Sequence, residues 1–510
     1  MRAPLAASVA LLLAVPLSAQ CPDGTPPPCG RTAAAAPAGG ANSVAVLLFT
    51  NVTRDSTYAY LSEGLSSEIA TSLAGVPRLE VRSPGVVRGL QRHAEGDPRL
   101  LGRRLGVRYV VEGDYQRSGE RIRVSVRLVT VASGTQRWSS AYTRSSADLL
   151  AVQEDVAREV ATSIAGQLLP QERTRFTARA SVNPEAWDHF LRGNYQLAKR
   201  TQDGIERAVE EYAQASRLDP AFASPEARIA LAWALYIDWA WPTPLPQDSM
   251  LARGLAAADR AIARDSTNAD AYMARGYLHS FLSSRDYAQV LRDFDRSLAL
   301  DPRNAEALHQ YASKLGELND QKRAIAMERR ALEVDPDRPV SYMVMGKSYM
   351  ALRRDDEARR ALDSSLTLDP LFYTSSVYRG QLALVHGDIA AACRDADAAM
   401  HSALPGDGWR VMMRAACQAA QGDTASAVRT YTEMAAPYDT ARFVPEQQAI
   451  ALAYVAGRLR RADDALRWLE HSRPSGAVLW SELLGPGYDP LRGDPRFQRF
   501  MDTIRPLGAR

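Results

Sequence analysis

Residues 304–370 read NAEALHQYASKLGELNDQKRAIAMERRALEVDPDRPVSYMVMGKSYMALRRDDEARRALDSSLTLDP, and this stretch decides the fold. One Asp-Pro pair lies just before this stretch, at residues 301–302, and two more lie within it, at 335–336 and 369–370. The prolines therefore recur every 34 residues. Proline lacks a backbone N–H and ends a helix. Between the pairs, large apolar residues recur at spacings of three or four, as on one face of an amphipathic helix. The stretch therefore predicts two consecutive units of two helices each.

Small residues stand where the two helices of each unit have to approach closely. Ala324 and Ala331 hold such places in the first unit, and Gly346 holds one in the second. A 34-residue helix–turn–helix unit that ends in Pro resembles the tetratricopeptide (TPR) repeat. The resemblance implies an all-α solenoid of about seven repeats over residues 182–472. Residues 473–510 are the predicted C-terminal cap, since residues 488–495 and the helix expected at 496–504 resemble the usual ending of such chains.

Composition narrows the classes of function. The chain has 510 residues, which leaves room for more than one domain, and its hydrophobic content of 46% is sufficient for a core. Its 62 basic and 59 acidic residues nearly balance, and no basic run indicates nucleic acid. The seven histidines are scattered, no nucleophile elbow occurs, and Gly346-Lys347-Ser348 matches only the end of a P-loop inside a predicted helix. These observations predict no catalytic residue, no metal and no cofactor, and hence a protein that is not an enzyme.

Residues 1–19 have the pattern of a secretory signal peptide. Arg2 is followed by an apolar stretch at 5–15 and by the small residues of a cleavage site at 17–19. The pattern predicts export to the periplasm or out of the cell, with an uncleaved anchor as the alternative. Gln20 stands before Cys21 where a lipobox has Gly or Ala, which argues against lipidation. No membrane span is expected in the mature chain, and association with a membrane surface is left open.

Residues 20–42 are rich in Cys, Pro and Ala and form a predicted linker. Cys21 and Cys29 bracket a turn-forming stretch, so an oxidising compartment favours a disulfide between them, with a two-thiol metal site as the weaker alternative. Cys393 and Cys417 fall on successive predicted helices. We expect these two to be separate buried thiols, and a second bridge is the alternative.

The segment 43–169 has a different period and predicts a small α/β domain of two layers. It opens with the apolar run 43–49, which is typical of a strand buried on both faces. Residues 122–128 alternate apolar and polar side chains, as in a strand with one solvated face. The remaining predicted elements are helices at 58–73 and 149–168 and strands at 79–82, 107–115 and 136–142.

Four short segments of this domain resemble TolB amino-terminal-like and FlgO-like domains of bacterial envelope and signalling proteins. They are residues 43–49, residues 63–65 with Glu68, residues 106–113 and residues 134–138. In such chains TPRs typically follow this domain, and a cyclase, a kinase or a DNA-binding winged helix often precedes it. Here the predicted secretion signal takes that place. The resemblance therefore implies action through binding.

The candidate binding site is the concave groove that the first helix of each TPR lines. Its residues combine apolar and polar side chains with a single cation, whereas TPRs that hold a carboxylate terminus use several Asn, Lys and Arg there. An extended or helical protein segment is therefore the predicted ligand. The alternative is that these positions are merely solvated. The groove residues are Met273, Tyr277, His309, Ser313, Met343, Lys347 and Gln381.

A second candidate contact patch consists of aromatic residues, because Trp and Tyr supply large contact areas at interfaces. The alternative is that a loop packs these rings against the solenoid. The residues are Trp233, Tyr236, Trp239 and Trp241.

Taken together, these patterns predict a non-catalytic scaffold, secreted or periplasmic, that binds protein partners through a TPR groove in envelope assembly or secretion. The alternative function is that of a sensor, whose α/β domain binds a small molecule and relays the signal to the array.

Overall fold

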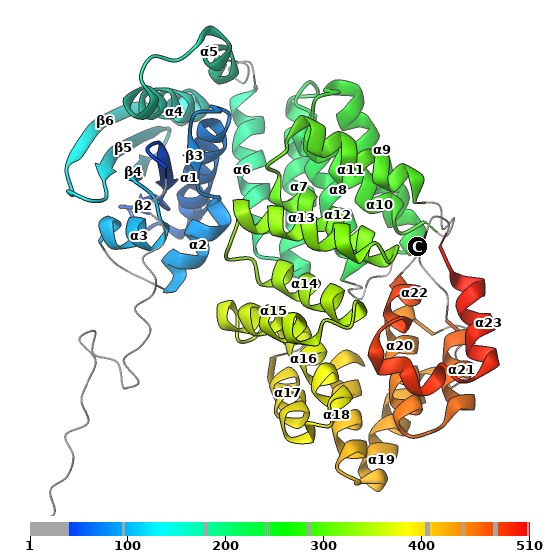
Figure 1. Ribbon diagram of the computed structural model, residues 1–510. Coiled ribbons are helices and arrows are strands. Elements are labelled where there is room, and N and C mark those ends of the chain that lie inside the picture. Colours follow the sequence, from blue (N-terminus) through cyan, green and yellow to red (C-terminus); the bar gives the residue numbers. More distant parts are fainter. Residues whose placement is uncertain are drawn as a thin grey trace, which may run out of the picture.

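The computed structural model describes a small α/β domain followed by a long series of helices (Figure 1). The predicted signal peptide and both Cys21 and Cys29 lie outside the described residues. The described residues are 40–93, 97–177, 182–239, 241, 243, 245–282, 287–402, 408–439, 441, 444–472, 478–506 and 509.

One mixed sheet forms the centre of the α/β domain, in the strand order β3-β1-β4-β5-β6, with β2 beside β4. β1 runs parallel to β3 and β4, whereas β4, β5 and β6 form an antiparallel meander. The strands are β1 (Ser43–Val46), β2 (Thr50–Asn51), β3 (Glu80–Val81), β4 (Tyr109–Ser118), β5 (Arg121–Thr130) and β6 (Gln136–Ser145).

Helices cover both faces of the sheet near β1. Val44 and Val46 belong to the core that contains α1 (Ala59–Ala74) and α4 (Leu149–Ala165). Ala45 and Leu47 belong to a separate core with α2 (Pro84–His93) and α3 (Pro98–Arg104). The predicted two layers therefore gain a partial third layer, because β1 is apolar on both sides. Short elements complete the domain: η1 (Ser56–Tyr58), η2 (Ser146–Asp148) and α5 (Pro170–Thr177).

The rest of the chain confirms the predicted fold class, an α/β domain followed by an all-α TPR solenoid. Eight consecutive helix pairs pack within the described residues, where the sequence predicts about seven repeats. The pairs are α6 (Pro184–Ala198) with α7 (Gln202–Leu218), α8 (Ser224–Asp238) with α9 (Gln247–Arg264), α10 (Ala269–His279) with α11 (Ala288–Leu300), α12 (Ala305–Glu317) with α13 (Gln321–Val334), α14 (Pro339–Ala351) with α15 (Asp355–Leu368), α16 (Tyr373–Val385) with α17 (Ile389–Ser402), α18 (Gly408–Ala420) with α19 (Thr424–Ala435), and α20 (Glu446–Arg458) with α21 (Ala462–Glu470).

Glycine allows the two helices of a pair to approach closely. A Cβ atom at Gly346 would lie 2.7 Å from Cγ of Leu362, and one at Gly193 would lie 2.5 Å from the Tyr212 ring. Both distances are shorter than van der Waals contact, so these positions exclude a side chain. In most repeats, one residue of the turn between the two paired helices has a positive φ angle. Glycine adopts this conformation readily, whereas other residues adopt it at a cost in free energy. These turn residues are Arg200, Asn319, Arg353, Gly387, Gly422 and Arg460.

The C-terminal segment turns back toward the middle of the array (Figure 1). Its elements are α22 (Val478–Leu483), η4 (Pro486–Leu491) and α23 (Pro495–Ile504). α22 contacts both α20 and the distant helix α12, and η4 contacts α20 and α16. The segment thus lies between the last repeats and the first helices of the middle repeats.

The α/β domain and the first repeat share one hydrophobic core. Nε1 of Trp187 on α6 donates a buried hydrogen bond of 2.9 Å to Oε1 of Gln153 on α4. Tyr60 on α1 donates to the carboxylate of Asp188, and Gly64 lies against Leu191. The domain is therefore built onto the array and is not a separate unit on a flexible tether.

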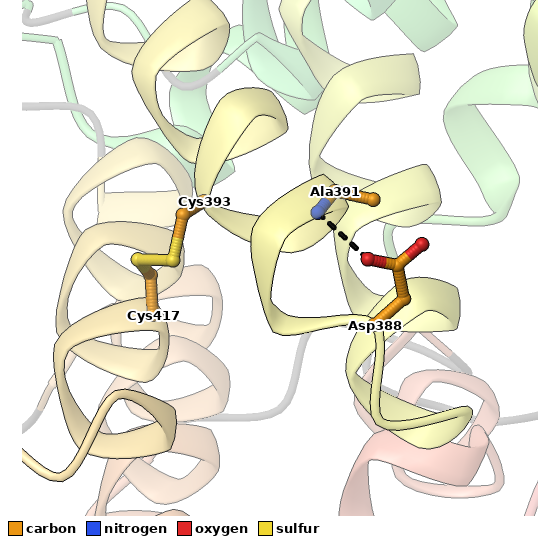
Figure 2. The surroundings of a disulfide bond; sticks show 4 residues. All are labelled: Asp388, Ala391, Cys393 and Cys417. Carbon is orange, nitrogen blue, oxygen red and sulfur yellow. Dashed lines mark hydrogen bonds between the residues drawn. A yellow bond between two sulfur atoms is a disulfide. The ribbon is translucent and has the colours of Figure 1, made fainter.

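Cys393 on α17 and Cys417 on α18 form a disulfide, with their Cα atoms 5.2 Å apart (Figure 2). The expectation of two separate thiols is wrong. The two residues are 24 positions apart in the sequence, and that spacing does not reveal that neighbouring helices bring the sulfurs into contact. A disulfide forms and persists in oxidising compartments.

We expect replacement of both cysteines (C393S/C417S) to lower the free energy of unfolding by about 3 kcal/mol, because the bridge closes a loop of 24 residues and restricts the unfolded chain. Urea unfolding of both proteins under non-reducing conditions measures the difference. Wild-type protein treated with dithiothreitol should behave like the variant. Equal stability of variant and wild type would contradict the prediction.

Candidate functional site

The first helices of the repeats form one continuous inner row. α8 contacts α10, α10 contacts α12, and the contacts continue through α14, α16, α18 and α20. Each second helix packs mainly on the first helix of its own repeat and on the first helix of the next repeat. The row of first helices is therefore the concave side of the array, where TPR proteins offer their binding surface.

The structure places the seven predicted groove residues on this inner row, but several are buried. Met273 and Tyr277 on α10 are 0% and 2% exposed, and His309 on α12 and Gln381 on α16 are also buried. Ser313, Met343 and Lys347 are half-buried. Four of the seven positions are therefore closed to solvent, and the role of these residues in partner binding stays a prediction.

Lys314 lies at the centre of a buried polar cluster that sequence reasoning missed. Its Nζ is 2.5 Å from Oε1 of Glu317, and the hydroxyl of Tyr287 donates to the other Glu317 oxygen at 2.9 Å. The same ammonium lies 5.4 Å from the Tyr277 ring centroid and 5.5 Å from that of Phe281, as in a cation–π contact. Burial and the neighbouring Asp238 raise the pKa of Tyr277 well above its ordinary value. The cluster fastens α10 to α12.

Glu306 links repeats that are distant in the sequence. Its Oε2 accepts a hydrogen bond of 2.9 Å from Arg338 before α14 and lies 3.6 Å from Nη2 of Arg200, which follows α6. Burial favours the neutral acid, but the charges of Arg338 and Arg200 outweigh burial and hold the pKa of Glu306 well below its ordinary value. Because one carboxylate joins the first, fourth and fifth repeats, it stabilises the curvature of the array.

A similar pair lies beside it: Nη2 of Arg228 on α8 is 3.0 Å from Oδ2 of Asp270 on α10. The side chain of Asn304 donates to the other Asp270 oxygen at 2.9 Å. The amino-terminal half of the concave side is therefore occupied by ion pairs within the chain.

The α/β domain adds charges to the same region. The carboxylate of Glu68 on α1 acts electrostatically on Arg228, and Arg82 acts on Asp337 in the turn before α14. The domain thus lies beside the concave side, which the sequence does not reveal.

In the carboxyl-terminal half, the chain's own C-terminal segment occupies the concave side. The ammonium of Lys347 on α14 forms an ion pair with Glu482 on α22. The hydroxyl of Tyr378 on α16 donates to the same Glu482 oxygen at 3.0 Å. Arg353 donates two hydrogen bonds, of 2.9 and 3.0 Å, to the two oxygens of Asp489. Sequence reasoning found Lys347 but not its partners, because Lys347 and Glu482 are 135 positions apart.

The four residues of the aromatic patch lie together. Tyr236 is buried and its hydroxyl donates to Glu206 at 2.8 Å. Trp241 packs edge-on against both Tyr236 and Trp239, with ring centroids 5.5 and 4.8 Å apart, and Trp233 lies 6.0 Å from Tyr236. Trp239 is 41% exposed. The rings therefore pack as a group with one indole facing outward, and a partner contact there stays a prediction.

A hollow of about 420 Å³ lies between α15, α16 and α17 and is lined mainly by charged residues. Its central cation, Arg379, donates to both Asp395 and Asp363. Since these carboxylates neutralise Arg379, the hollow offers no free charge of that residue to a ligand. Within the described residues, no three His, Cys, Asp or Glu side chains are grouped as metal ligands, and no helix has the length and apolar character needed to cross a bilayer.

No protein-family model matches the chain. A relative from Rhizobium meliloti (strain 1021), named putative adenylate cyclase 3, is 28% identical over 250 residues, which cover 48% of this chain and 42% of the relative. The chain therefore spans less than half the length of that protein. Yeast Tom70 aligns with 70% of this chain and 83% of its own, at 15% identity and a TM-score of 0.39. PilW, described as a type IV pilus biogenesis factor, aligns with 42% of this chain and 95% of its own, at 20% identity and a TM-score of 0.35.

The match to a protein named as a putative adenylate cyclase contradicts the prediction that this chain is not an enzyme. That prediction rests on the absence of local motifs. Side chains from separate helices can meet without leaving a motif, as the cluster of Lys314, Tyr277 and Asp238 demonstrates. The conclusion that the chain lacks catalytic function is therefore withdrawn.

We expect Glu306→Gln to lower the free energy of unfolding at pH 7 by about 2 kcal/mol, because Arg338 and Arg200 lose their shared carboxylate. The pKa of Glu306 is depressed in the folded state, so its contribution is fully present above the unfolded value near 4.5 and is lost as pH falls below it. The difference between variant and wild type should therefore shrink below pH 4.5 in urea titrations. Glu333→Gln, at an exposed position on α13, is the control. A pH-independent difference would contradict the electrostatic explanation.

Proposed function

We propose that this protein is an exported scaffold that binds segments of partner proteins on the concave side of its TPR array. The observation that carries the proposal is the inner row of first helices, where Lys347 and Tyr378, together with Arg353 in the turn after α14, already hold side chains of another segment. A surface that binds Glu482 and Asp489 of its own chain has the donors required to bind a protein segment.

Two observations support a location outside the cytoplasm. The disulfide between Cys393 and Cys417 is of the kind found in oxidising compartments, and residues 1–19 have the pattern of a secretory signal. The resemblance of four short segments within residues 43–169 to TolB amino-terminal-like and FlgO-like domains supports a role in envelope assembly or secretion.

A photoreactive benzophenone side chain tests the site of binding. Placed at Met343, on the concave side, it should crosslink protein partners in the periplasm at least fivefold more than one placed at Lys322, which is exposed on α13. The comparison is stringent, because Met343 is the less exposed position. The crosslinks are formed with the full-length protein, and mass spectrometry of the crosslinked complexes identifies the partners. Equal yields at both positions, or crosslinking only at Lys322, would show that the concave side is not the binding surface.

A sensor function is the second candidate, because the α/β domain and the first repeat share a core through Trp187 and Gln153. A ligand in the domain could then influence the array. A small molecule that binds only the folded state raises the melting temperature. Thermal-shift screening of the full-length protein is expected to find such a molecule, and hydrogen exchange should then show protection in both the domain and α6. Protection confined to the domain would argue against a relay.

The name of the curated relative also identifies a reaction to assay. Incubation of the full-length protein with ATP and Mg²⁺, followed by measurement of cyclic AMP, tests nucleotide cyclisation directly. Activity would be an addition to the scaffold function, because partner binding depends on a different observation.

A further inference from the structure

We propose that residues 478–491 are a built-in ligand of the concave side, and that the external partner is an acidic protein segment that replaces the carboxylates of Glu482 and Asp489. This inference rests on the proposed scaffold function and adds the chemistry of the partner. We call residues 478–491, which comprise α22 and η4, the resident segment.

The resident segment makes specific polar contacts with two helices of the inner row, α14 and α16, and with the turn that follows α14. Glu482 is 7% exposed and receives both the ammonium of Lys347 and the hydroxyl of Tyr378. Asp489 receives a bidentate hydrogen bond from Arg353, the geometry in which guanidinium binds carboxylate best. Two carboxylates seven positions apart are thus bound by two cations and a phenol of the array, and Asp489 is also bound by Arg492, three positions further along the chain.

The apolar side chains of the resident segment face the other way. Leu479, Leu483, Tyr488 and Leu491 belong to a core formed with the last repeats, and the backbone N–H of Leu479 donates to Glu446 on α20. The apolar residues of α12 and α14 belong to two other cores. No hydrophobic cluster among the described residues joins the resident segment to α12 or α14, and the side-chain contacts that hold it to α14 and the following turn are the ion pairs of Lys347 and Arg353.

Polar contacts of this kind separate more readily than a shared apolar core. The side chains of Arg353 and Asp489 are 48% and 42% exposed, and that of Lys347 is 32% exposed. The pair of Arg353 with Asp489 is exposed on both sides, and such pairs are individually weak and screened by salt, whereas Lys347 holds the buried carboxylate of Glu482. They persist here because the chain holds the two sides at a high effective concentration.

α16 joins the middle repeats, which contain α14, to the last repeats, which carry the resident segment. Val377, Ala383 and Leu384 pack into the core of the last repeats, whereas Tyr378 and Leu382 pack into the core that contains α14. A small rotation about α16 would therefore move the resident segment away from Lys347 and Arg353 while the apolar core of the last repeats stays intact. The exposed cations would then be available to carboxylates of a partner.

Hydrogen exchange tests the opening. The E482Q/D489N variant keeps the size of both side chains and removes both charges, so amide exchange in residues 478–491 should become at least tenfold faster than in wild type. The control is E433Q/D502N, which neutralises two exposed carboxylates in the same half of the molecule. Unchanged exchange in E482Q/D489N, or equal acceleration in the control variant, would overturn the proposal that these carboxylates hold the resident segment on the concave side.

Selection from a random peptide library tests the chemistry of the partner. The full-length E482Q/D489N variant should enrich peptides rich in Asp and Glu at least tenfold more strongly than wild type. Adding K347A and R353A to that variant should abolish the enrichment. Enrichment of non-acidic peptides, enrichment that survives loss of both cations, or no enrichment at all would overturn the inference.

The two proposals can fail separately. If the Met343 photocrosslinks find partners but the library selects no acidic peptides, the scaffold function stands and the proposed partner chemistry is wrong. If neither finds a partner, both proposals fail. Peptides that match residues 478–491 would identify a second copy of this chain as the partner, which would contradict the proposed external partner.

Discussion

The close approach of the two helices in each pair is the constraint on which the rest of the structure depends. Gly346 faces Leu362, and Gly193 faces Tyr212, at distances that leave no space for a Cβ atom. This contact determines how far apart successive first helices lie, and hence the curvature of the inner row. The ion pairs of Glu306 with Arg338 and Arg200 form only because that curvature brings the first repeat near the fourth and fifth.

Apolar and polar contacts have different roles in this array. Apolar side chains hold neighbouring helices together and define three large clusters along the solenoid. Polar side chains span the concave side, where they join elements far apart in the sequence, such as Lys347 with Glu482. The first kind of contact gives the array its stability, and the second kind can exchange partners without unfolding the repeats.

Local pattern was sufficient to predict the fold class. The 34-residue period and the small residues on paired helices identified the solenoid, and the apolar run at 43–49 indicated a strand covered on both faces. Local pattern could not reveal which distant side chains meet. The pairing of Cys393 with Cys417 was therefore predicted wrongly, and burial of Met273 and Tyr277 in the hydrophobic core was not foreseen. The prediction of no catalysis was wrong for a related reason, since it depended on motifs within short stretches.

The core shared by the α/β domain and the first repeat has a consequence for biosynthesis. Until α6 emerges from the ribosome, the face of α1 around Gly64 and the buried amide of Gln153 lack Leu191 and Trp187. The nascent domain is therefore left with an uncovered apolar surface for as long as residues 184–198 are missing. Its folding must either wait for them or rely on a chaperone that shields that surface.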